Sequence, residues 1–171
     1  MRKSGWLIAV LLAFLPARGV EAALHFRSQG LSAAGRVQLK EAFGEAYVRT
    51  QTCEALAARP ELRHRALALY EGGGLRFEAV PRDEESPYEC AYTLPGFLSG
   101  QTVHLHPMAL TEDCVSLTST VFHEVLHVAK SPGAVFSDLI DGGASEEAEV
   151  TILEHRCFPE FFTVVRGLQA P

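Results

Sequence analysis

The chain has 171 residues, of which 47% are hydrophobic, and a formal net charge of −6 at neutral pH. This length and apolar content predict one globular domain with a hydrophobic core of its own. Lys and Arg number 15 against 21 Asp and Glu, and they gather into no basic patch, so nucleic acid is not expected as a partner.

Residues 1–22 have the features of a secretory signal peptide. A basic start is followed by an apolar run over residues 6–15, and small residues precede the bond between Ala22 and Ala23. A membrane anchor is the alternative, but the run is shorter than the roughly 20 residues that cross a bilayer. We therefore expect cleavage after Ala22, export to the periplasm or the cell exterior, no stable membrane insertion afterwards, and a single domain over 23–171.

Two helices are predicted in the first half of this domain. Ser32 is a suitable N-cap for a helix over 33–58, and Pro60 is expected to end that helix. A second helical pattern covers 61–71 and stops at the three glycines of 72–74, which are strong helix breakers.

Two strands are predicted next. Residues 75–80 alternate between apolar and polar side chains, and so do residues 101–107 ("QTVHLHP"). Because Pro107 follows the second strand, we expect that strand at the edge of its sheet, where an extended peptide can pair with it. His104 and His106 then lie on its polar face, either as solvent-facing residues or as part of a second metal site.

The last predicted elements are two helices joined by a loop. The first covers about 115–129, and the second begins with Ser145 as its N-cap and ends before Pro159. Helices, a few short strands and two further helices predict an α+β domain with a small sheet.

The helix over 115–129 contains the stretch "TVFHEVLHVAK". Residues four apart lie on the same face of a helix, so His123 and His127 can direct two ring nitrogens at one ion. Glu124 is rotated away from that line and can reach a water molecule on the metal without binding the metal itself. This pattern is the H-E-x-x-H zinc motif.

The alternative is an ordinary core helix whose histidines only pack and form hydrogen bonds. Apolar residues fill almost every other position over 121–129, which is typical of a helix buried on most sides. Two buried histidines and a glutamate are costly unless they are paired or bind a metal ion. The apolar setting therefore favours a metal site over a hydrogen-bonded network.

A catalytic zinc site usually has three protein ligands and one open position. The sequence "SEEAE" at the start of the last predicted helix offers Glu146, Glu147 and Glu149 as the third ligand. The apolar positions Val150 and Leu153 place Glu146 on the inward face of that helix.

The motif helix, the loop and the glutamate-bearing helix resemble the gluzincin branch of the zincin metallopeptidases, over roughly residues 101–159. Thermolysin-like members have their glutamate ligand at the spacing of Glu147, also followed by alanine, whereas the aminopeptidase branch has a spacing that selects Glu146. The resemblance implies a zincin-like domain in which His123, His127 and Glu147 bind one zinc ion, with Glu146 as the alternative ligand.

The resemblance further implies that Glu124 is the general base and that the chain is a secreted zinc metallopeptidase. Such an enzyme hydrolyses a peptide or protein substrate through a zinc-activated water. The sequence departs from the thermolysin-like pattern at Thr151, where those enzymes carry an aspartate that supports a zinc histidine. Glu149 is a candidate for that supporting role. Candidates for the side chain that stabilises the oxyanion are His155, Tyr92 and His104.

Two alternative functions stay open. The departure at Thr151 leaves room for a catalytically inactive zincin-like domain that acts as a binding or inhibitory module. The other alternative is a structural or binding protein stabilised by disulfides, in which the histidines only pack.

The four cysteines agree with export, because their number is even and none is spaced C-x-x-C; they are Cys53, Cys90, Cys114 and Cys157. In an oxidising compartment we expect two disulfides. Three pairings are open, and order along the chain favours Cys53–Cys90 with Cys114–Cys157.

Overall fold

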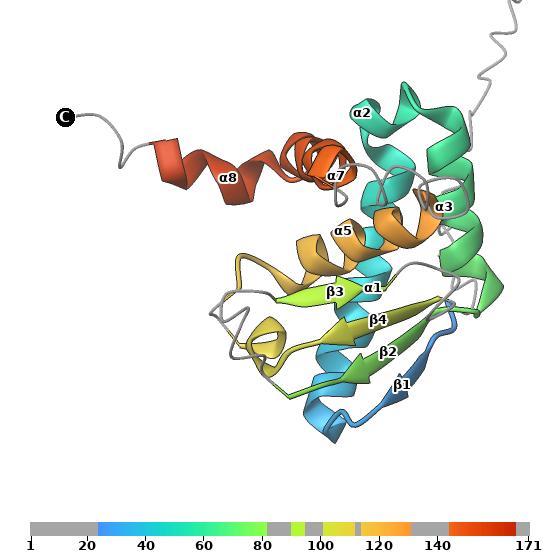
Figure 1. The fold of residues 1–171 in the computed structure, drawn as a ribbon, viewed down its shortest axis with the longest axis vertical. Coiled ribbons are helices and arrows are strands. Elements are labelled where there is room, and N and C mark those ends of the chain that lie inside the picture. The colour runs from blue at the N-terminus through green and yellow to red at the C-terminus, as the bar shows by residue number, and fades with distance from the viewer. Residues whose placement is uncertain (1–23, 82–89, 95–100, 112–113, 131–143, 167–171) are drawn as a thin grey trace, which may run out of the picture.

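The structure is a computed structural model that describes residues 24–81, 90–94, 101–111, 114–130 and 144–166. Helices pack on one face of a four-stranded sheet, so the predicted α+β class is confirmed (Figure 1). The predicted signal peptide lies outside the described residues. Among the described helices, none has the length and apolar character needed to span a membrane.

Helix α1 (Ala33–Thr52) begins at the predicted cap, where the Ser32 hydroxyl accepts a hydrogen bond from the Gly35 N–H at 3.0 Å. The helix predicted over 33–58 is divided, because Cys53 adopts an extended backbone between α1 and the single turn of α2 (Glu54–Ala57).

Helix α3 (Pro60–Gly72) begins at the proline that was expected to end the preceding helix. Proline is favoured at this first position, because its missing N–H would have no partner there. Gly73 ends α3 in the left-handed conformation, with φ of 63°, which glycine adopts without steric cost.

The sheet has the strand order β1-β2-β4-β3, with bounds β1 (Arg27–Gln29), β2 (Arg76–Ala79), β4 (Thr102–Leu105) and β3 (Ala91–Thr93). Strands β1, β2 and β4 are parallel, and β3 is antiparallel to β4. The prediction that the 101–107 strand is an edge strand is wrong, because β4 lies between β2 and β3. The strand itself ends at Leu105, and Pro107 starts the 3₁₀ turn η1 (Pro107–Leu110) outside the ladder.

The core fills the space between the sheet and the helices. Phe77 and Val103 of the sheet are fully buried, and Phe77 packs edge-on against Phe43 of α1, which in turn contacts Tyr70 of α3. The expectation that His104 and His106 face solvent is wrong for His106, which is 1% exposed and lies beyond the end of β4.

Helix α5 (Leu117–Lys130) packs against α1, α3 and β3, and α7 (Ala144–Cys157) packs against α5. Ser145 lies within the first turn of α7 rather than at its N-cap. Pro159 begins a final helix, α8 (Pro159–Arg166), which extends away from the other elements in Figure 1.

Two disulfides are present, Cys53–Cys157 and Cys90–Cys114, so the pairing favoured by chain order is wrong. Cys157 ends α7, which packs against α2 next to Cys53. Cys90 precedes β3 and Cys114 precedes α5, and β3 contacts α5. The packing of α7 and β3, rather than order along the chain, therefore decides which cysteines meet.

Candidate metal centre

Hydrophobic packing fixes the helix that carries the two histidines. Val121, Phe122, Val125 and Leu126 of α5 are all fully buried. His123 and His127 lie one turn apart on the side of α5 that faces α7, and their side chains are 15% and 16% exposed. The rings are therefore held at the border between the core and the surface.

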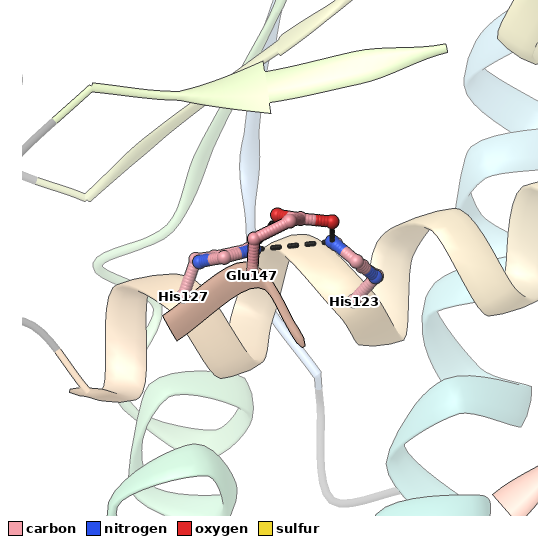
Figure 2. A group of neighbouring side chains, drawn as sticks. All are labelled: His123, His127 and Glu147. Carbon is pink, nitrogen blue, oxygen red and sulfur yellow. Dashed lines mark hydrogen bonds and ion pairs between the residues drawn. The ribbon is translucent and has the colours of Figure 1, made fainter. Parts of the chain in front are cut away.

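Glu147 of α7 lies opposite both rings (Figure 2). One carboxylate oxygen is 3.3 Å from His123 Nε2, and the other is 3.0 Å from His127 Nε2. The two Nε2 atoms are 3.0 Å apart. In the part of the chain that the structure describes, this is the only group of three His, Cys, Asp or Glu side chains whose ligand atoms converge closely enough to hold a metal ion.

Two further carboxylates contact the far nitrogens of the same rings. Glu154 Oε2 lies 2.9 Å from His123 Nδ1, and Glu146 Oε1 lies 3.2 Å from His127 Nδ1. The helical pattern correctly predicted that Glu146 faces inward, since it is 8% exposed. Its carboxylate nevertheless approaches Nδ1, whereas Glu147 approaches the Nε2 atoms.

Glu149 does not support a histidine, contrary to the suggestion from the sequence. Its carboxylate binds Lys130 at 2.7 Å and Arg59 at 2.5 Å. The hydrogen bond to Lys130 holds the pKa of Glu149 below its usual value. This glutamate therefore links α7 to the end of α5 and to the start of α3, away from the two rings.

The cluster carries an excess of negative charge. Burial alone would lower the pKa of His123, but hydrogen bonds to Glu147 and Glu154 outweigh it and raise that pKa to about 10. The same hydrogen bonds between Glu147 and the two rings hold the pKa of Glu147 far below its usual value. The carboxylates around the two rings therefore stabilise positive charge, which protons or a metal ion can supply.

Glu124 is 5% exposed and lies beside the cluster. Burial raises the pKa of Glu124 to about 7, although the nearby His123 and His127 and a hydrogen bond with Thr93 of β3 act in the opposite direction. Its Oε2 atom is buried and makes no hydrogen bond with the described residues. A buried oxygen without a partner is costly in a purely structural role.

A hollow of about 270 Å³ connects these groups; it is lined by Ala91, Tyr92, Thr93, His123, Glu124, His127 and Glu147. One wall is β3, at the edge of the described sheet, and the other is the side of α5 and α7 that carries His123, Glu124, His127 and Glu147. A second hollow of about 220 Å³ shares Ala91, His123 and Glu124 with the first. The two hollows therefore adjoin at these three residues.

The three oxyanion candidates lie in different places. Tyr92 lines the hollow, whereas His104 of β4 is not among the lining residues and stacks on the Tyr92 ring with centroids 4.7 Å apart. His155 stacks on Phe162 at 3.8 Å and is not among the residues that line the hollow.

Sequence reasoning missed Thr93 and Glu154. Glu154 lies seven residues after Glu147, which is two helical turns, so its position on the same face of α7 was available from the spacing. Strand β3 is three residues long and carries no readable alternation, so nothing in the sequence places Thr93 beside Glu124.

Comparison of the chain with protein-family models, with curated proteins and with solved structures finds no match. The case for a function therefore depends on the chemistry of the residues themselves.

Proposed function

We propose that the chain is a secreted zinc metallopeptidase that hydrolyses peptide bonds. The observation that carries the proposal is the convergence of both Nε2 atoms and the Glu147 carboxylate beside the buried carboxylate of Glu124. Two imidazoles and one carboxylate form a common ligand set of catalytic zinc sites. The two disulfides agree with a protein that works outside the reducing cytosol.

The residues present fit a zinc ion, which His123, His127 and Glu147 would hold. When bound, zinc lowers the pKa of a water ligand and polarises a carbonyl oxygen. The side chain of Glu147 is 58% exposed, so the ligand group stays accessible to solvent and to substrate on one side. On the other side, the buried face of α5 keeps the two rings in place.

Glu124 has the position required of the proton carrier. It follows His123 directly in the chain, lines the hollow and has one buried oxygen that no described residue hydrogen-bonds. The carboxylate of Glu124 would accept a proton from the attacking water and then pass it to the amine that leaves when the peptide bond breaks.

A peptide substrate is the class that best fits the shape of the site. Strand β3 is at the edge of the described sheet and forms one wall of the hollow, so an extended peptide can pair with it as an additional strand. We therefore propose β3 as the docking strand, in place of the 101–107 segment favoured by the sequence pattern.

Metal analysis combined with the Glu124→Gln variant tests the proposal. We expect about one zinc per chain in protein purified without chelator. We expect Glu124→Gln to retain this zinc and to lose about 10²- to 10⁴-fold in hydrolysis of unfolded protein substrates. Glu41→Gln on α1, outside the site, is the control and should retain activity. Absence of zinc binding by the wild type, or full activity of Glu124→Gln, would refute the proposal.

A catalytically inactive zincin-like module is the second candidate. The observation in its favour is Thr151, which hydrogen-bonds Glu147 at 3.1 Å and supports no histidine. Bound zinc without turnover of any substrate in a broad screen of unfolded and cell-envelope proteins would favour this candidate over the peptidase.

A further inference from the structure

We propose that Glu154 and Glu146 are positioning residues that orient the two histidines for metal binding. This inference rests on the proposed metal site and adds the groups that give the site its geometry. Neither carboxylate approaches the Nε2 atoms, so both act through the histidines they contact.

The two contacts determine which ring nitrogen carries the proton. A carboxylate accepts hydrogen bonds, so His123 Nδ1 at 2.9 Å from Glu154 and His127 Nδ1 at 3.2 Å from Glu146 must each donate one. The metal-binding form of each imidazole is neutral and has one N–H, which these contacts hold on Nδ1, so each Nε2 gives up its proton and offers its lone pair to the ion. Both lone pairs are directed to the side where Glu147 lies, which is the arrangement that a shared metal ion needs.

Helix α7 supplies all of these carboxylates as one rigid unit. Glu146 and Glu147 lie in its first turn, and Glu154 follows Glu147 by about 10 Å along the helix axis. The first turn of α7 contacts His127 through Glu146, and its later part contacts His123 through Glu154. One helix therefore fixes the spacing between the ligand and both positioning groups.

Burial gives the two positioning contacts their strength. The side chains of Glu154 and Glu146 are 13% and 9% exposed, so water competes little for their oxygens. The contact of Glu154 is the shorter, and Glu146 leaves its Oε2 atom buried without a partner among the described residues. We therefore expect Glu154 to contribute more than Glu146.

Zinc affinity is the decisive measurement, because it reports on the site without relying on turnover. The dissociation constant is measured by competition with a chromogenic chelator for wild type, Glu154→Ala, Glu154→Gln and Glu146→Gln. We expect Glu154→Ala to weaken zinc binding by about 10- to 100-fold, and Glu154→Gln, whose carbonyl can still accept the hydrogen bond, by less. Glu146→Gln should fall between Glu154→Gln and the wild type.

Glu149→Gln is the matched control, since Glu149 is on the same helix and binds Lys130 and Arg59 instead of a histidine. It should lose some stability and keep its zinc affinity within about threefold. The visible absorption of the cobalt-substituted protein should change in Glu154→Ala and stay the same in Glu149→Gln. A loss of stability alone would not change this absorption. Circular dichroism in the presence of chelator verifies that each variant folds without metal. If Glu154→Ala does not fold, the isosteric Glu154→Gln variant takes its place in both measurements.

The outcomes separate this inference from the proposed function. A wild type that binds zinc and hydrolyses peptides, with Glu154 and Glu146 variants that bind zinc equally well, overturns the positioning role alone. A wild type that does not bind zinc overturns both proposals.

Discussion

Removal of the Cys53–Cys157 disulfide should destabilise the protein more than removal of Cys90–Cys114. The first disulfide closes a loop of 104 residues and the second a loop of 24. Loop-closure entropy then gives a loss of about 4.7 kcal/mol for the long loop and about 3.4 kcal/mol for the short one, a difference of about 1.3 kcal/mol. The 90–114 loop lies within the 53–157 loop, so the intact Cys90–Cys114 crosslink shortens the long loop in the unfolded chain. The difference of about 1.3 kcal/mol is therefore an upper value.

The assay is urea unfolding of the two double-alanine variants in the presence of chelator, so that metal binding does not contribute. Free energies of unfolding come from the midpoint and the slope of each transition. The wild type under reducing conditions gives the loss when both crosslinks are absent. Equal losses, or a larger loss for the 90–114 pair, would refute the entropic reasoning.

Three further predictions concern the fold. Phe43→Ala should cost about 3–5 kcal/mol in urea unfolding, because Phe43 is 1% exposed and contacts three aromatic rings, whereas a loss below 1 kcal/mol would contradict its core role. Gly44→Ala in α1 should stabilise the protein by up to about 1 kcal/mol, since an added Cβ has open space. Gly30→Ala should destabilise it by more than about 1 kcal/mol, because the φ of Gly30 is +77° and Ala79 lies 3.2 Å from the added Cβ. Thermal unfolding of both variants checks these opposite signs. A hydrogen bond to Glu71 raises the pKa of Tyr47, and burial raises the pKa of Tyr70. The contribution of both tyrosines to stability is therefore present below about pH 10 and is lost as the pH rises through their folded-state pKa values. Absorbance at 295 nm should show two tyrosines that ionise at a higher pH than free tyrosine, and titration of all tyrosines at the ordinary pH would refute this.

The helices were predictable because their ends carry local chemistry. Ser32 caps α1 as expected, and the glycines after α3 end it. The break at Cys53, which adopts an extended backbone and is bonded to a cysteine more than 100 positions away, was marked by no local signal in the sequence. Pro60 was misread as an end signal for the same reason that it makes a good start: it lacks a backbone donor.

The strands were less predictable because they are short. Strands β1 and β3 have three residues each, too few for an alternation to be recognised. The position of β4 inside the sheet follows from its pairing on both sides with β2 and β3, which no local signal encodes. Pro107 suggested an edge, but it lies beyond the last paired residue.

The residues of the candidate site were predictable to the extent that they obey helical spacing. His123 and His127 lie four apart and therefore meet, whereas Glu147 was indicated by the resemblance to thermolysin-like peptidases. The inward face of α7 pointed to Glu146 instead. Both patterns describe real features of the structure: Glu146 is the more buried, and Glu147 is the residue that contacts both Nε2 atoms.

The departure at Thr151 argues less against catalysis than the sequence suggested. In a thermolysin-like arrangement the expected aspartate would support a zinc histidine from the helix that carries the third ligand. Here Glu154 contacts His123 Nδ1 from that same helix, and the Thr151 hydroxyl donates to Glu147 instead. If Glu154 has the positioning role we propose, the chain keeps a carboxylate for its histidine and adds a hydrogen bond to its third ligand. The choice between a peptidase and an inactive module then depends on Glu124 and on the groups that face the hollow along β3, and Glu124→Gln tests the first of these directly.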